Sequence, residues 1–239
     1  MFTFEELMRS LNTSMANDFL AVNPAKNPVT QLLYRGKFNE LSYVVQQYAI
    51  FPKAIVDLMK LAEQKALKAG WYQVANELKE NIAEELGSST KGISHYDLLA
   101  NGLEEGLQLP IKSVQPSAAT KTLLAMLDRI FDKSAAHALG ATYALEATSI
   151  PELSLVRQII ELLLEGDLSH DLKYFFEMHL NEWEPEHEED LRRSLESYIN
   201  ADEFQAFSEG FQAVLGTMDV WWLQLTAEVK ARDLVLQNV

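Results

Sequence analysis

Residues 204–229 read FQAFSEGFQAVLGTMDVWWLQLTAEV, and this stretch decides the fold class. Apolar side chains recur in it every three or four positions, which is the spacing of one face of an α-helix. The apolar positions are Phe204, Phe207, Phe211, Val214, Leu215, Met218, Trp222, Leu225 and Val229. We therefore predict a long helix over residues 202–235 that presents one continuous apolar face.

The same helical periodicity continues toward the N-terminus, and no stretch alternates convincingly between apolar and polar residues. It predicts helices over residues 3–20, 38–50, 53–68, 71–86, 93–106, 118–132, 134–148, 151–165 and 169–200. Breaks are expected at Asn23-Pro24, Asn27-Pro28, Phe51-Pro52 and Ile150-Pro151, because the residue before a proline avoids the α conformation. No internal repeat and no shift in composition divides the chain. We predict one all-α domain over residues 1–239, a helical bundle.

Composition excludes several classes of function. The chain has 239 residues, of which 48% are hydrophobic, so a full-sized core is available. It has 35 acidic against 20 basic residues and a net charge of −15, which disfavours nucleic acid and membrane surfaces as partners. It has no cysteine, so disulfides, thiolate metal sites and cysteine nucleophiles are excluded. No apolar run reaches the roughly 20 residues of a membrane helix, and the first residues do not resemble a signal peptide. We expect a cytoplasmic protein.

With cysteine absent, histidines and carboxylates are the candidate chemical groups, and the first cluster is NIAEELG (residues 81–87) followed by His95. Glu85 ends one predicted helix and His95 begins the next, so the two side chains can converge on one ion. Acids near the C-terminus of a helix oppose its dipole, which weakens the interpretation of Glu84 and Glu85 as ordinary solvated acids. That interpretation remains the alternative.

The second candidate is Glu146, which lies in the small and apolar sequence ALGATYALEA (residues 138–147). A carboxylate in such surroundings is expected to be buried, and burial of a charge is costly unless a cation or hydrogen-bond donors compensate for it. Glu146 is therefore either a metal ligand or a buried acid bonded to a tyrosine or an arginine.

The third cluster is the densest, HLNEWEPEHEED over residues 179–190. His179 and His187 are eight residues apart, which places them on different faces of a regular helix. Pro185 lacks an N–H and clashes with the preceding turn, and a π-bulge there would return both histidines to one face, with Glu184 three residues before His187. The alternative is a solvated acidic segment in which both histidines are incidental.

Together these clusters bring carboxylates and imidazoles from separate helical regions, and such mixed ligation in a bundle suits iron or manganese. The pattern differs from ferritin-like bundles, in which two helices each carry a Glu-x-x-His pair. His137 and His170 fall outside the pattern and are interpreted as structural or surface residues.

Taken in order, these motifs resemble the haem-oxygenase-like, iron-containing redox enzymes, which include the CADD-type proteins. Thiaminase II and pyrroloquinoline-quinone synthase are relatives in fold. The family's pattern is a Glu followed by a His, a lone Glu on a later helix, and then His-x-x-x-Asp-x-x-His. NIAEELG with ISHYDLL, AHALGATYALEA and FEMHLNEWEPEHEEDL resemble its three parts. The resemblance implies as metal ligands Glu85, His95, Glu146, His179, Glu184 and His187.

The chain departs from the family at two points. Glu85 and His95 are ten residues apart where the family more often has seven, so the loop GSSTKG must bulge outward. The last motif is one residue too long and has Glu184 where Asp is usual. Without a bulge, Trp183 would occupy the carboxylate position.

The resemblance implies a haem-oxygenase-like bundle that holds one or two irons, with manganese as an alternative. It also implies a non-haem oxidase or oxygenase that uses O₂ on a small molecule, and a homodimer. One alternative is a thiaminase-II-like or cofactor-free enzyme in the same cavity. The other is a non-catalytic helical interaction protein.

Overall fold

The chain folds as an all-α bundle in a computed structural model that describes residues 2–35 and 37–236. For residues 182, 184, 185 and 233–236 it describes the backbone alone. The described residues form no β-strand. The α-helices are α1 (Phe4–Asp18), α2 (Thr30–Arg35), α3 (Phe38–Tyr48), α4 (Ile50–Ala69), α5 (Tyr72–Glu85), α6 (His95–Leu107), α7 (Ala118–Phe131), α8 (Ala135–Leu163), α9 (His170–Met178), α10 (Glu184–Leu195) and α11 (Phe204–Leu236), and a π-helical turn, His179–Trp183, joins α9 to α10.

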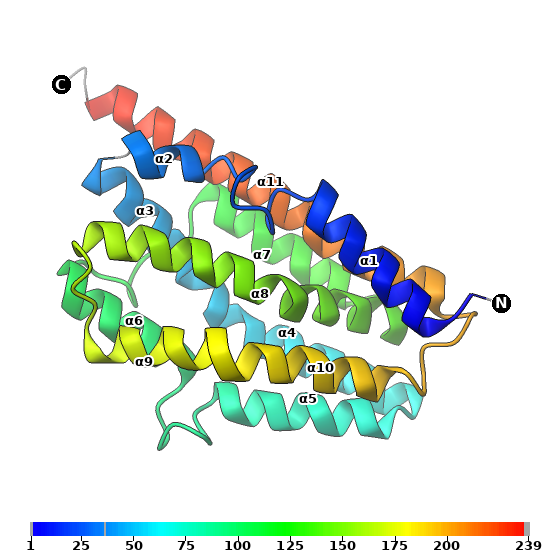
Figure 1. The fold of residues 1–239 in the computed structure, drawn as a ribbon. Coiled ribbons are helices and arrows are strands. Elements are labelled where there is room, and N and C mark those ends of the chain that lie inside the picture. Colours follow the sequence, from blue (N-terminus) through cyan, green and yellow to red (C-terminus); the bar gives the residue numbers. More distant parts are fainter. Residues whose placement is uncertain (1, 36, 237–239) are drawn as a thin grey trace.

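Helix α8 is the central element of the bundle. It lies between α11 and α10 and packs against both (Figure 1), and it also contacts α3, α4 and α7. All residues from 136 to 148 are buried, as expected for a helix surrounded by others. The side chains that α8 carries in this stretch therefore face protein on every side, and polar groups among them need partners.

Two glycines allow α8 and α11 to approach closely. A Cβ atom added to Gly140 would lie 2.0 Å from the carbonyl oxygen of Phe207, and one added to Gly210 would lie 1.9 Å from that of His137. Both distances are far below van der Waals contact, so no larger residue fits at either position. Further along the same pair of helices, Glu152 of α8 lies beside Trp222 of α11.

The predicted break at Ile150-Pro151 is wrong, because α8 runs as one helix through Pro151. An interior proline costs about 3 kcal/mol. Several residues beyond it are buried, including Ile159 and Ile160 at 0% exposure, and burial of each contributes about 1.5–3 kcal/mol. The hydroxyl of Ser149 also donates to the carbonyl of Glu146 at 2.6 Å in the turn that the proline disturbs. Packing on both sides of Pro151 therefore outweighs the local penalty.

The break at Phe51-Pro52 lies elsewhere than predicted. Helix α3 ends at Tyr48 and α4 begins at Ile50, which places Pro52 in the first turn of α4. A proline is tolerated there because the first N–H groups of a helix have no partner within it.

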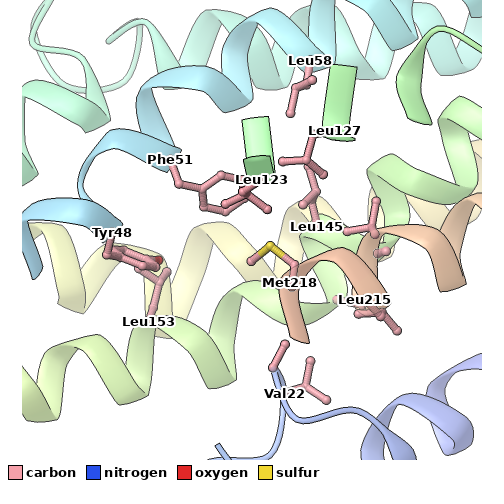
Figure 2. Packing of buried hydrophobic residues seen from close by; sticks show 14 of the residues in the cluster. Val22, Tyr48, Phe51, Leu58, Leu123, Leu127, Leu145, Leu153, Leu215 and Met218 are labelled. Atoms are coloured by element: carbon pink, nitrogen blue, oxygen red, sulfur yellow. The ribbon is translucent and has the colours of Figure 1, made fainter. Parts of the chain in front are cut away.

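Apolar side chains from almost every helix form the core. Figure 2 shows part of it, where Leu123 and Leu127 of α7, Leu145 of α8 and Met218 of α11 gather. In the part of the chain that the structure describes, no helix combines the length and the apolar character that crossing a membrane requires.

Candidate metal centre

Glu85 and His95 meet where α5 ends and α6 begins. Glu85 is the last residue of α5, and His95 is the first residue of α6, whose N-cap is Ser94. Between them the chain reverses through Gly87 and Gly92, both at positive φ. Oε1 of Glu85 lies 3.0 Å from Nδ1 of His95. The expected outward loop thus brings the two predicted residues into direct contact despite their ten-residue separation.

His179 enters the same site from the first position of the π-helical turn. Its Nδ1 donates to the carbonyl oxygen of Phe175 at 2.7 Å, which leaves Nε2 as the nitrogen with a free lone pair. Burial lowers the pKa of His179 to about 4, although the charge of Glu85 opposes the shift. His179 is therefore neutral at physiological pH, as a metal ligand must be.

The three side chains form a cluster of ligand atoms. One donor atom from each of Glu85, His95 and His179 lies within 4.8 Å of the others. Nε2 of His95 is buried and has no hydrogen-bond partner among the described residues. A buried polar atom without a partner costs about 1–3 kcal/mol, so an orphaned imidazole nitrogen beside a second imidazole and a carboxylate fits a metal ion. One carboxylate and two histidines are a donor set typical of non-haem iron.

The π-helical turn lies within the third motif of the sequence. It occupies residues 179–183 and only Glu184 separates it from Pro185, so the predicted bulge is present. His187 is buried on α10, and its Nε2 lies 2.9 Å from Oε2 of Glu84, the neighbour of Glu85. The side chain of Glu184 lies outside the described residues.

Trp183 lies against the histidines of the cluster. Its ring stacks on His95 with centroids 4.1 Å apart and planes at 7°, and it meets His179 edge-on at 4.8 Å. An indole offers no lone pair to a metal, so Trp183 is not itself a ligand. Its ring contacts orient both imidazoles and exclude water from that side.

Glu146 approaches the site from α8 but lies outside the three-residue cluster. It is 8% exposed and accepts a hydrogen bond from Nδ2 of Asn81 at 3.1 Å. Burial, and then the charge of Glu85, raise the pKa of Glu146 to about 8. The predicted burial is confirmed, and the partner is an asparagine amide rather than the tyrosine or arginine of the alternative.

Glu85 and Glu146 differ in protonation. Burial alone would raise the pKa of Glu85, but the hydrogen bond from His95 and the neighbouring histidines outweigh it and leave the pKa below its ordinary value. Glu85 is therefore ionised while Glu146 holds a proton. Two buried acids that interact in this way can bind a cation between them once the second proton leaves.

A small cavity opens beside the cluster. Its volume is about 60 Å³, and Glu85, His95 and His179 form part of its wall. The remaining wall is mainly apolar and comes from α3, α4, α8 and α9. A molecule that entered it would lie next to the three candidate ligands.

Comparison with known proteins places the chain in a family. The family model described as "Domain of Unknown Function with solved-structure structure (DUF3865)" matches residues 5–228. The chain belongs to the DUF3865 family. No curated protein matches it.

Two crystal structures of a CADD-like protein of unknown function from Nostoc punctiforme PCC 73102 resemble this DUF3865 chain. One, at 2.00 Å resolution, is 50% identical, covers 95% of this chain and 98% of its own, and has a TM-score of 0.91. The other, at 1.35 Å resolution, is 48% identical, covers 96% of each chain, and has a TM-score of 0.90. The resemblance to CADD-type proteins therefore extends over almost the whole chain.

Sequence reasoning missed three residues that surround the site of this DUF3865 protein. Glu84 had no part in the predicted ligand set and figured only in the alternative of solvated acids, yet it contacts His187. Asn81 holds Glu146, and its position four residues before Glu85 on the same helical face was a signal that could have found it. Trp183 was considered only as an obstacle. His170 is exposed, with 93% of its side chain accessible, and His137 is buried beside Lys133, so neither belongs to the site.

Proposed function

We propose that this DUF3865 protein is an iron-dependent oxidase or oxygenase that uses O₂ on a small molecule. The carrying observation is the convergence of Glu85, His95 and His179 within 4.8 Å, with Nε2 of His95 buried and unpartnered among the described residues. We further infer that the bundle is a single haem-oxygenase-like domain over residues 1–239, as the CADD-like relatives and the ordered motifs support.

The proposed ligand set extends beyond the cluster. Glu85, His95 and His179 would hold one iron, and Glu146, Glu184 and His187 would complete a second position. Manganese has similar ligand preferences and is the alternative ion. When bound, ferrous iron would supply the site at which O₂ is activated.

Other residues of the chain prepare these ligands. The carbonyl of Phe175 fixes the tautomer of His179, so that Nε2 faces the cluster. Asn81 orients the carboxyl group of Glu146. The ring of Trp183 keeps the plane of His95 fixed and covers both histidines. Because these supports come from α5, from α9 and from the π-helical turn, the ligands are held before any ion binds.

The remaining expectations are part of the same proposal. A small organic substrate, a homodimer and a cytoplasmic location rest on the family resemblance and on composition. The absence of nucleic-acid and membrane partners stays a prediction from the net charge of −15.

Anaerobic addition of ferrous iron to chelator-treated protein tests the proposal, followed by admission of O₂ while the optical spectrum is recorded. We expect about one or two irons per chain and a transient absorption after O₂. The double variant Glu146→Ala/His179→Ala should lose the iron. His170→Ala, an exposed histidine on the same helix as Phe175, is the matched control and should keep it.

Failure of the unaltered chain to bind iron would overturn the proposal. It would favour a cofactor-free enzyme or a helical interaction protein. Retention of stoichiometric iron by the double variant would show that the ion lies elsewhere.

A further inference from the structure

Glu152 is a buried acid that the proposed metal centre does not use. It lies on α8 one residue after Pro151, and only 2% of it is exposed. Six residues separate it from Glu146, which corresponds to roughly 9 Å along the helix axis. Glu152 nevertheless lines the same cavity as Glu85, His95 and His179. The cavity therefore has a second acidic position beside the candidate metal ligands.

The surroundings of Glu152 contain a donor but no cation. Nε1 of Trp222 donates to Oε1 of Glu152 at 3.2 Å. Among the described residues, no lysine or arginine forms an ion pair with it, and the nearby charge of Asp219 is negative. Burying an acid with one neutral donor is costly, so such a group in a cavity wall is a candidate binding position.

The other polar groups of the cavity wall on α8 are already engaged. The hydroxyl of Thr148 donates to the carbonyl of Leu145 at 3.2 Å, and that of Ser149 donates to the carbonyl of Glu146 at 2.6 Å. Both hydroxyl protons thus serve their own helix. Among the residues of α8 in this wall, Glu152 is the ionisable group that remains for a ligand in the cavity.

The rest of the wall is apolar and selects for a short hydrocarbon. Phe51 of α4, Leu153 of α8 and Phe175 of α9 line it together with Tyr48 of α3. Figure 2 shows three of these, Tyr48, Phe51 and Leu153, within the core. A volume of about 60 Å³ limits the ligand to a small molecule or to the end of a longer one.

We propose that Glu152 anchors the cationic nitrogen of a small alkylamine substrate, whose hydrocarbon part lies in the apolar cavity beside His95 and His179. The proposal rests on the proposed function, because it names the substrate class of that site. A buried carboxylate and an ammonium group form a strong charge-assisted hydrogen bond, whereas a neutral alcohol forms only an ordinary one. An anionic ligand would meet the ionised carboxylate of Glu85 in the same wall and be repelled.

The amine would replace a proton. Burial raises the pKa of Glu152 to about 8, with the indole of Trp222 opposing and Asp219 adding to the shift. At neutral pH the free carboxyl group is therefore protonated. Binding of an ammonium ion ionises Glu152 and releases this proton to solvent, so the heat of binding should depend on the ionisation enthalpy of the buffer.

Calorimetric titration of the full, chelator-treated chain with butylamine, butanol and butyrate tests the proposal. We expect butylamine to bind at least about tenfold more tightly than butanol, and butyrate not to bind. Glu152→Gln should weaken butylamine binding at least about tenfold while leaving butanol unchanged. The matched control is Glu161→Gln, which alters an acid of the same helix that pairs with Arg157 at the surface; it should leave both affinities unchanged.

Equal binding of butanol and butylamine would overturn the proposal, as would unchanged butylamine affinity in Glu152→Gln. The ranking of the three ligands on the unaltered chain decides the matter even if the variant folds poorly. Iron binding by the same samples separates this proposal from the proposed function. Iron retained with no preference for the amine would overturn the substrate class alone, whereas an amine preference without iron would overturn the metal centre alone.

Discussion

Glu146 and Glu152 lie six residues apart on the same helix, and burial raises the pKa of each to about 8. Their neighbours differ. Glu146 accepts from Asn81 and lies near Glu85, beside a cluster that contains two histidines. Glu152 accepts from the indole of Trp222 in a largely apolar wall.

The comparison shows that burial and protonation do not by themselves assign a role to an acid. Both carboxyl groups are protonated at neutral pH, yet only Glu146 interacts with the charge of Glu85, a member of the cluster. The interaction with Glu85, which belongs to the cluster, makes Glu146 a candidate ligand for an ion. Glu152 lines the cavity beside the cluster but has no cationic partner among the described residues, which makes it a candidate anchor for a ligand's positive charge. The experiments below test whether the two acids are separable in this way.

The largest difference is expected in metal binding. His179→Ala should weaken ferrous iron binding at least about 100-fold, because structural metal sites draw about 10–16 kcal/mol from about four ligands, or several kcal/mol from each. Glu152→Gln should leave iron affinity unchanged. Competition with a coloured chelator measures both affinities. Equal losses in the two variants would show that Glu152 belongs to the metal centre.

The pH dependence of iron affinity should be the second difference between Glu146 and Glu152. Glu146 has a pKa of about 8 and must lose its proton to bind a metal, so iron affinity should rise between pH 6 and pH 8. The rise should be about 50-fold, close to tenfold per pH unit, and should level off above pH 8. His179, with a pKa of about 4, contributes no slope in this range.

Two variants provide the controls for this slope. Glu146→Gln should abolish it, and Glu152→Gln should keep it. A slope that persists in Glu146→Gln would mean that another group holds the proton.

Much of this arrangement could be predicted from the sequence. The periodicity located the long C-terminal helix, and the placement of Glu85 and His95 at a helix joint led directly to their contact at 3.0 Å. Pro185 predicted a widened turn, and the π-helical turn His179–Trp183 precedes it. These predictions succeeded because each depends on local backbone geometry.

The rest depends on contacts between distant segments, which spacing does not report. Pro151 predicted a break because its penalty is local, whereas the burial that overrides it comes from α11 and other helices. Glu152 attracted no attention, because its significance comes from Trp222, 70 residues away. The adjacent acids Glu84 and Glu85 contact different histidines, and only the relative placement of α5, α6 and α10 decides which.

The stability of the fold should also depend on pH through Glu152. In the unfolded chain this carboxyl group has a pKa of about 4.3, and in the folded protein it is about 8. A raised folded pKa favours the folded state fully below the unfolded pKa, and this contribution is lost as pH rises toward 8. Between pH 6 and pH 8, ionisation of Glu152 should lower the unfolding free energy of the unaltered chain by about 2 kcal/mol. The variant Glu152→Gln should lack this decrease. Urea unfolding at both pH values measures it, and parallel pH profiles for the two proteins would contradict it.

The smallest effect should come from the indole that serves Glu152. Trp222→Phe keeps most of the buried ring but removes the N–H that donates to Oε1 at 3.2 Å. The lost hydrogen bond should destabilise the fold by about 1 kcal/mol and raise the pKa of Glu152 further, because the donor favours the ionised form. Butylamine binding should therefore weaken at pH 7, since the amine must displace a more tightly held proton, whereas iron affinity should not change.

The neighbouring indole provides the control: Nε1 of Trp221 donates to the hydroxyl of Thr120, so Trp221→Phe should lower stability without altering amine affinity. Equal effects of the two variants on amine binding would mean that the indole of Trp222 acts through packing and not through the carboxyl group of Glu152.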